Sequence, residues 1–165
     1  MSGTPRLDLP FLSAGQAQKE FTHNEALQTL DMLVAGSVEE GPRADPPTSP
    51  ALGACYIVDA SPTGAWAGKS QSVAAYTSGG WRFVAPVDGI TLYIKANSEW
   101  ASYRAGAWEI GMLRGAGLLI GGEQVVGARQ DPIVSPIGGA TIDSEARSAI
   151  NQILAAMREH GLIES

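Results

Sequence analysis

The segment at residues 41–50 constrains the fold more than any other part of the chain, because it carries four prolines in ten residues. Proline fixes φ and lacks a backbone N–H, so this segment can be neither a helix interior nor a central strand. We predict a stiff, extended linker there. It follows an N-terminal helical arm at residues 1–40 and is able to hold that arm away from the body that begins at residue 51.

The arm is expected to be helical over most of its length. Possible capping boxes begin at Ser13 and at Thr22, and Gly36 is expected to end the helix. Apolar residues recur at helical spacing and predict one stripe that must be buried on the β body, on the C-terminal helix or on another subunit: Ala26, Leu27, Leu30, Leu33 and Val34.

Residues 51–129 show a different pattern, in which short β-branched and aromatic runs alternate with Gly, Ser, Asn and Pro. Such runs at short spacing predict strands. The pair Gly121-Gly122 lies between two apolar runs and predicts a tight hairpin with a primed turn. We therefore expect a small antiparallel β body of hairpins, sandwich- or barrel-like.

A Pro- and Gly-rich loop at residues 130–141 is expected to lead into a C-terminal helix at residues 142–165. Asp143 or Thr141 should cap its start, and Gly161 with Leu162 should form a Schellman stop. Its predicted apolar stripe consists of Ile142, Ala146, Ala149, Ile150, Ile153, Leu154 and Met157. The fold class is thus α+β, with amphipathic helices on both sides of the β body.

Composition excludes several classes of function. The net charge is −6 and the basic residues are scattered, so we expect no nucleic-acid partner. No stretch of the sequence predicts a membrane-spanning helix or a secretory signal. Cys55 is the single cysteine, which fits a reducing compartment. It lies in an apolar run and is expected to be a buried, inert thiol.

The sequence offers no recognisable catalytic set, so we do not expect an enzyme. His23 and His160 lie near opposite ends of the chain, so no pair of His has metal-ligand spacing. We predict no catalytic, metal or cofactor site. A glycan-cleaving enzyme remains a third hypothesis, because carboxylates fall near aromatic residues of the β body: Asp59, Asp88, Glu99 and Glu109.

Two groups of residues are candidates for binding. The first is a carbohydrate or partner face, since flat aromatic rings stack on sugars: Trp66, Trp81, Trp100 and Trp108. Alternatively, these rings build a β core or a subunit interface. The second group is a candidate assembly interface: Phe11, Gln16, Gln18, His23 and Asn24. Its polar side chains can donate and accept hydrogen bonds to a neighbouring protein, or simply form a solvent-facing surface.

Three stretches resemble an uncharacterised family from alphaproteobacterial prophages and gene transfer agents. They are LPFLSAGQAQKEFTHNEAL at residues 9–27, AWAG at residues 65–68 and GGATIDSEARSAI at residues 138–150. The likeness covers nearly the whole chain. The first stretch is long and specific, whereas the central β part is looser.

The resemblance implies a structural protein of a phage-like particle, such as the base of a gene transfer agent head spike. Such a base is expected to sit at a five-fold capsid vertex and to hold a fibre that contacts the capsule of recipient cells. The implied partners are further copies, favouring a pentamer, a capsid protein, and a spike or fibre protein. The implied location is the virion, assembled in the bacterial cytoplasm. A tail-fibre protein or a carbohydrate-binding module is the alternative.

Overall fold

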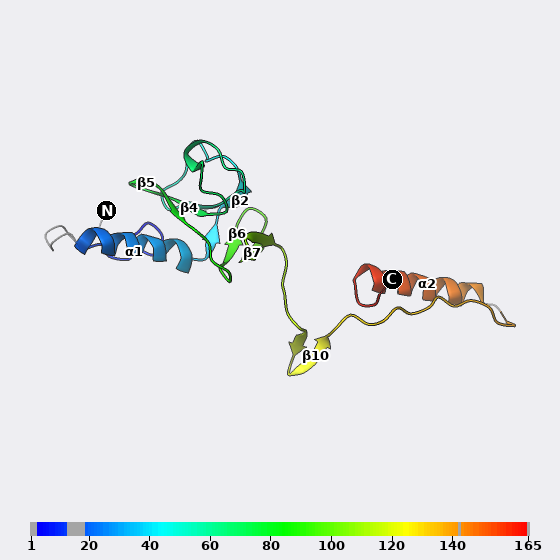
Figure 1. Cartoon of the computed structure of the whole chain (residues 1–165). Coiled ribbons are helices and arrows are strands. Elements are labelled where there is room, and N and C mark those ends of the chain that lie inside the picture. Colours follow the sequence, from blue (N-terminus) through cyan, green and yellow to red (C-terminus); the bar gives the residue numbers. More distant parts are fainter. Residues whose placement is uncertain (1–2, 13–18, 142, 165) are drawn as a thin grey trace. The chain divides into compact units, whose positions relative to one another are not determined.

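The computed structural model describes residues 3–12, 19–141 and 143–164. The chain divides into two compact units, residues 1–112 (unit 1) and residues 113–165 (unit 2), which are described separately. Unit 1 contains helix α1 and strands β1–β8, and unit 2 contains strands β9 and β10 and helix α2 (Figure 1). The predicted α+β class is confirmed.

The first sheet of unit 1 has the strand order β2-β3-β4-β5. Its strands are β2 (Glu40–Arg43), β3 (Cys55–Val58), β4 (Val73–Thr77) and β5 (Gly80–Val84). Successive side chains of a strand point to opposite faces, yet every residue of β3 is buried. This sheet is therefore covered on both faces.

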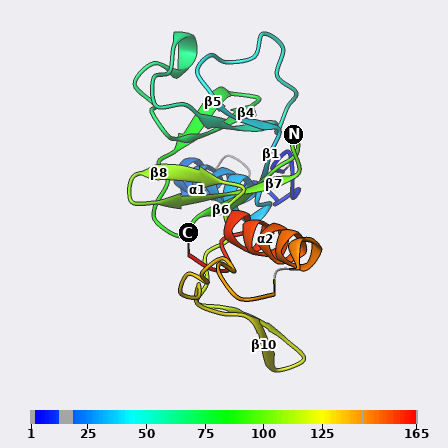
Figure 2. The same ribbon diagram turned by 90° about the vertical axis from the view of Figure 1, so that its right-hand side faces the viewer.

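The second sheet has the order β1-β6-β7-β8. Its strands are β1 (Ser37–Val38), β6 (Thr91–Ile94), β7 (Glu99–Arg104) and β8 (Ala107–Ile110). The two sheets of unit 1, seen in Figure 2, share one hydrophobic cluster as in a small sandwich. Its buried members are Met32, Val38, Cys55, Ile57, Val73, Ala75, Leu92, Ile94 and Ala101.

Two of the strand pairings correct the prediction of a purely antiparallel body. Strand β1 pairs with β6 in parallel, and β2 pairs with β3 in parallel. Both β1 and β2 precede residue 44, so the sheets begin inside the segments expected to be arm and linker. Pro42 is tolerated because β2 is an edge strand. Residues 44–50 form neither helix nor strand.

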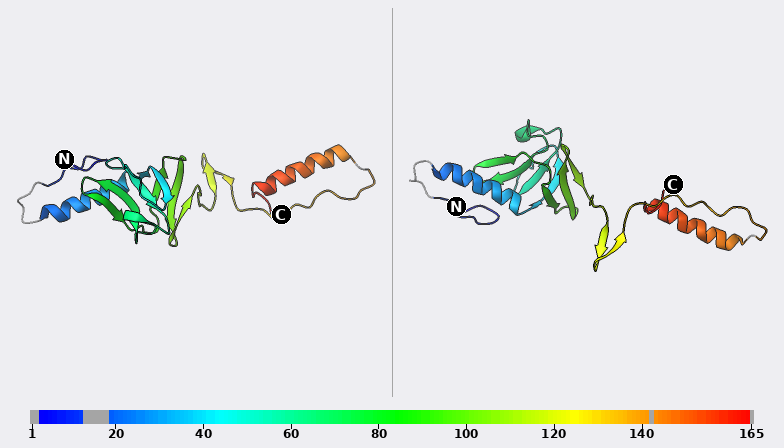
Figure 3. Two further views of the ribbon diagram at one scale, coloured as in Figure 1. Left: turned by 90° about the horizontal axis from the view of Figure 1, so that it is seen from above. Right: turned by 60° about the horizontal axis from the view of Figure 1, so that its bottom comes forward.

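Helix α1 (Lys19–Val34) lies beside the strands of unit 1 in both views of Figure 3. Met32 is 3% exposed in the shared cluster, and the Glu25 carboxylate pairs with the Arg82 guanidinium at 2.7 Å. Of the surfaces left open for the arm, the helix therefore packs on the body of its own chain. Thr22 lies inside the helix rather than at its cap, and Ser13 lies outside the described residues.

Part of the predicted apolar stripe of α1 faces away from the body, whereas Leu27 and Leu33 are half-buried. Leu30 and Val34 are 48% and 68% exposed, although burial was expected. The buried side instead carries Met32 and Asp31, whose carboxylate accepts hydrogen bonds from residues 4–7. The helix does end where expected, because Gly36 adopts a positive φ of 56°.

Unit 2 confirms the local predictions made for its hairpin and helix. Strands β9 (Leu118–Ile120) and β10 (Glu123–Val126) are antiparallel, and both turn glycines, Gly121 and Gly122, have positive φ. Helix α2 (Ser144–Glu159) is capped by the Asp143 carboxylate, which accepts the Ala146 N–H at 2.8 Å. It ends in a Schellman motif, with the Leu162 N–H donating to the Met157 carbonyl. Ile142 lies outside the described residues.

Candidate functional site

The four tryptophans do not share one face. Trp66 lies in the short 3-10 helix Gly64–Trp66 and is fully buried. Its ring centroid lies 5.1 Å from that of Trp81 and 5.8 Å from that of Tyr56. These rings cover the face of the first sheet that points away from the second sheet. They form a second core, so Trp66 has no surface to offer a sugar.

Trp108 is also part of a core. Its ring packs on the shared cluster, and its indole N–H donates to the Gln71 carbonyl at 2.8 Å. Trp100 differs, because it is 49% exposed and pairs with Tyr93 at a centroid distance of 5.4 Å. Tyr93, which the sequence did not single out as a candidate, is half-buried and completes an aromatic pair on the second sheet.

The candidate assembly interface of the arm is only partly available to a neighbouring protein. The Asn24 amide accepts from the Leu12 N–H at 2.9 Å and donates to the Leu12 carbonyl at 3.2 Å. Asn24 thus joins α1 to a segment of its own chain. Phe11 is half-buried and His23 is exposed. Gln16 and Gln18 lie outside the described residues.

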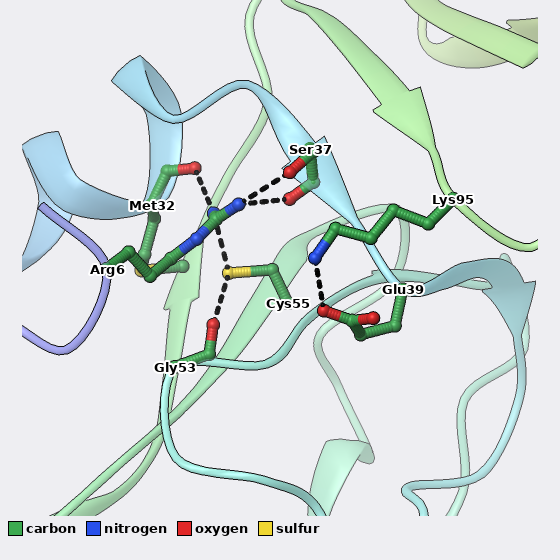
Figure 4. Close-up of polar contacts among 7 residues, drawn as sticks. All are labelled: Arg6, Met32, Ser37, Glu39, Gly53, Cys55 and Lys95. Atoms are coloured by element: carbon green, nitrogen blue, oxygen red, sulfur yellow. Dashed lines mark hydrogen bonds and ion pairs between the residues drawn. The ribbon is translucent and has the colours of Figure 1, made fainter. Parts of the chain in front are cut away.

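Arg6 forms a polar lock that the sequence did not predict (Figure 4). One guanidinium nitrogen donates to the Met32 carbonyl and to the Cys55 sulfur, each at 3.2 Å. The other donates at 2.8 Å to the backbone carbonyl and to the hydroxyl of Ser37. Arg6 therefore ties the N-terminal segment to helix α1, to strand β1 and to strand β3.

Cys55 is buried, as predicted. Burial raises the pKa of its thiol above the ordinary value, and the Arg6 charge opposes that effect only in part. Since the thiolate is the reactive form, the raised pKa makes Cys55 a poor nucleophile. The role of Cys55 in the structure is to fill the shared core and to accept a hydrogen bond from Arg6.

Asp31 anchors the same segment from the helix side. It is nearly inaccessible, and its carboxylate accepts from the Thr4 hydroxyl at 2.8 Å and from the backbone N–H groups of Arg6 and Leu7. An acidic residue placed between apolar neighbours in the helix was the available signal for this anchor. A buried carboxylate needs such partners, because an unpaired one is costly.

Unit 2 leaves most of its large apolar side chains exposed. Both hydrophobic clusters found among the described residues consist of unit 1 residues, whereas Leu154 and Ile163 are the buried apolar residues of unit 2. The exposed ones are Leu113, Leu118, Leu119, Ile120, Val125, Val126, Ile133, Val134, Ile137, Ile150, Ile153 and Leu162. Exposed apolar surface on this scale is a common feature of interaction sites.

Helix α2 presents one uncharged face. Arg147 and Arg158 donate to the carbonyls of Gly138 and Ile133, so the preceding loop runs along their side of the helix, as Figure 3 shows. The remaining apolar residues recur at intervals of four, three and four, the spacing of a coiled-coil seam: Ala146, Ile150, Ile153 and Met157. Ile150 and Ile153 are exposed, so nothing among the described residues of unit 2 fills this seam.

The described residues contain no group of three or more His, Cys, Asp or Glu that could hold a metal ion. No helix among them is both long and apolar enough to span a membrane. What the described residues do offer is two packed cores, the aromatic pair of Trp100 and Tyr93, and exposed apolar side chains on α1 and in unit 2.

The model of the family DUF2793, described as "Protein of unknown function", matches residues 23–109, which is more than half of the chain. The chain belongs to this family. The matched region runs from helix α1 through strand β8, so it lies within unit 1. No curated protein and no solved structure matches the chain.

Proposed function

We propose that this chain is a structural component of a phage-like particle: the oligomeric base of a gene transfer agent head spike, which joins a capsid vertex to a receptor-binding fibre. Its partners are further copies of itself, a capsid protein and a fibre protein. It is a virion protein without catalytic activity, assembled in the bacterial cytoplasm. The resemblance of its N-terminal signature to prophage and gene transfer agent proteins motivates the particle; the structure motivates the assembly.

One observation carries the proposal: the apolar residues of unit 2 have no core of their own to fill. A two-stranded hairpin such as β9–β10 is marginally stable by itself in water. Isoleucine at successive seam positions, as at Ile150 and Ile153, favours bundles of more than two helices. These features support association of several copies through α2, and a cyclic ring at a five-fold vertex is one such closed assembly.

The oligomer is tested by light scattering on the full chain and on a double variant, Ile150→Glu with Ile153→Glu. The matched control, Ser148→Glu with Gln152→Glu, adds the same charge to exposed positions outside the seam. We expect oligomers from the parent and the control and monomers from the seam variant. A parent chain that is monomeric at high concentration would contradict self-assembly.

The particle is tested by quantitative mass spectrometry of purified particles from a producing strain. A small fixed ratio of this chain to the major capsid protein, preserved through a density gradient, is expected of a vertex protein. A ratio fitting a single copy set per particle would place the chain in the tail instead. Absence from particles would refute the proposal.

A carbohydrate-binding role is a second candidate, favoured by the pair of exposed Trp100 and half-buried Tyr93. An exposed aromatic platform on a rigid sheet suits stacking against a sugar ring. Trp100→Ala should then remove binding on a glycan array, whereas substitution of the buried Trp66 would act only through folding. An array without signal for the parent would discard this candidate.

A further inference from the structure

The outer edge of strand β5 carries unpaired backbone groups. On the neighbouring strand, the Tyr76 N–H donates to the Ala54 carbonyl and the Tyr76 carbonyl accepts from the Gly53 N–H, so the backbone of Tyr76 is directed toward β3. Its cross-strand partner is Trp81. In an antiparallel ladder, bonded and non-bonded pairs alternate. Trp81 therefore directs its N–H and carbonyl away from β4, to the open side of the sheet.

Phe83 has the same orientation as Trp81, because it lies two residues further along β5 and pairs with Ala74. Strand β5 is the last strand of its sheet. Two N–H groups and two carbonyls consequently form a regular row on its outer edge. No backbone hydrogen bond from another described segment reaches them.

This edge borders a groove whose other wall is helix α1. The groove has a volume of about 250 Å³ and touches four consecutive β5 residues, Trp81 to Val84. Consecutive strand residues point to opposite faces, so a cavity that touches all four lies along the strand edge. The α1 wall contributes Glu25, Gln28, Thr29 and Met32, and Lys69 lies at the rim.

The opposite edge of the same sheet is closed to a further strand. Strand β2 contains Pro42, and its pairing with β3 is irregular between Glu40 and Arg43. Proline and bulges are the usual devices that prevent an edge from pairing with another chain. Strand β5 has neither feature, so the sheet is protected on one side and open on the other.

The groove carries one uncompensated positive charge. Both guanidinium nitrogens of Arg82 contact the Glu25 carboxylate, at 2.7 and 2.8 Å, which neutralises that pair. Lys69 places its ammonium 5.4 Å from the centre of the Phe83 ring and forms no salt bridge with a described residue. An occupant with a carboxylate beside Lys69 complements this charge.

We propose that the groove between β5 and α1 binds an extended, acidic segment of another polypeptide, which adds to the sheet as a fifth strand. Strand addition supplies affinity through main-chain hydrogen bonds and specificity through alternate side chains. The acidic side chain lies on the Phe83 face, beside Lys69. Alternate side chains lie on the other face, toward Thr29 and Met32, and are small and apolar. This inference does not depend on the chain being a particle protein.

The probe is an acetylated and amidated peptide, Thr-Val-Asp-Val-Thr-Val-Thr, added to the full-length protein. Amide hydrogen exchange is followed by NMR. We expect the N–H groups of Trp81 and Phe83 to exchange at least about tenfold more slowly, while the amides of β8 keep their rates. The same peptide N-methylated on alternate amides, on the edge that would pair, should give no protection.

A charge-reversal variant tests whether the groove prefers an acidic segment to any other extended segment. Lys69→Glu, at an exposed position, should weaken binding of the Asp peptide and strengthen binding of the peptide with Lys in its place. Arg104→Glu makes the same charge change at an exposed position of the second sheet and should alter neither.

Failure of the Asp peptide to protect Trp81 and Phe83 would overturn the proposal, as would equal protection by the N-methylated peptide. If Lys69→Glu changed the binding of neither the Asp peptide nor the Lys peptide, the proposal that the partner is acidic would be overturned. If the amides of Trp81 and Phe83 became more protected in the peptide-free protein as the protein concentration rose, the occupant would be a second copy of this chain. That result would also overturn the proposal. None of these outcomes bears on whether the chain is found in particles.

Discussion

Units 1 and 2 differ in whether they bury their own apolar side chains. Unit 1 places α1, two four-stranded sheets and a 3-10 turn around two hydrophobic clusters, and the DUF2793 match lies within it. Unit 2 folds a hairpin and a helix but does not bury their apolar faces within itself. Local sequence signals suffice to form a helix or a turn, whereas stability requires something to bury. The difference is between a unit that buries its apolar side chains itself and one that does not, which is the basis of the proposed assembly.

The largest expected effect is a loss of stability in unit 1. Trp66→Ala should lower the free energy of unfolding by about 3–5 kcal/mol, because it empties a fully buried site between Tyr56 and Trp81. Urea unfolding followed by circular dichroism measures this. A loss below 1 kcal/mol would show that the second core is not tightly packed.

Substitutions on the two sides of α1 should differ sharply in how much they lower the free energy of unfolding. Met32→Ala removes a buried side chain from the shared cluster and should cost about 2–4 kcal/mol. Leu30→Ala, on the exposed side of the same helix, should change the stability of the monomer by at most about 0.5 kcal/mol. Equal costs in urea unfolding would contradict the outward orientation of Leu30.

Alkaline pH should weaken unit 1 through Cys55. Burial raises the pKa of this thiol in the folded chain above its unfolded value of 9.0. The unfolded state therefore releases its proton first, and stability falls as the pH rises above about 9 toward the folded pKa. Cys55→Ala should remove this part of the slope between pH 8 and pH 10. Tyr56, whose pKa is also raised by burial, leaves a residual slope at higher pH. An unchanged slope in the variant would exclude the thiol as a cause.

The smallest effect is expected in unit 2. Ile153→Ala should change monomer stability by no more than about 0.5 kcal/mol, because the side chain is already exposed. The same substitution should weaken oligomers, which sedimentation measures as a higher dissociation constant. A large loss of monomer stability would instead mean that unit 2 has a core of its own.

Sequence reasoning succeeded where the interactions are local. The Asp143 cap, the Gly161 stop and the Gly121-Gly122 turn each depend on residues a few positions apart. It failed for the parallel pairings of β1 and β2, which join segments brought together only by the fold. Periodicity identified a helix in the arm but placed Leu30 and Val34 on its buried side, although both are exposed. It could not foresee that Asp31 would be anchored by residues 4–7.

The candidate binding residues show the same limit. Sequence placed all four tryptophans in the β body, but strand register and alternation decide which face each one occupies. Trp100 reaches the surface while Trp66 and Trp108 enter two different cores. The groove beside β5 had no sequence signal, because an open strand edge is a property of the backbone.

The contacts of Arg6 also affect the order in which unit 1 folds during synthesis. Arg6 is synthesised 31 residues before Ser37 and 49 residues before Cys55, two of the groups that it joins. At a translation rate of roughly 5–20 residues per second, its side chain waits for seconds before Cys55 has been made. The first residues of unit 1 are therefore among the last to settle. Until then, the site that Arg6 will occupy between α1, β1 and β3 does not exist.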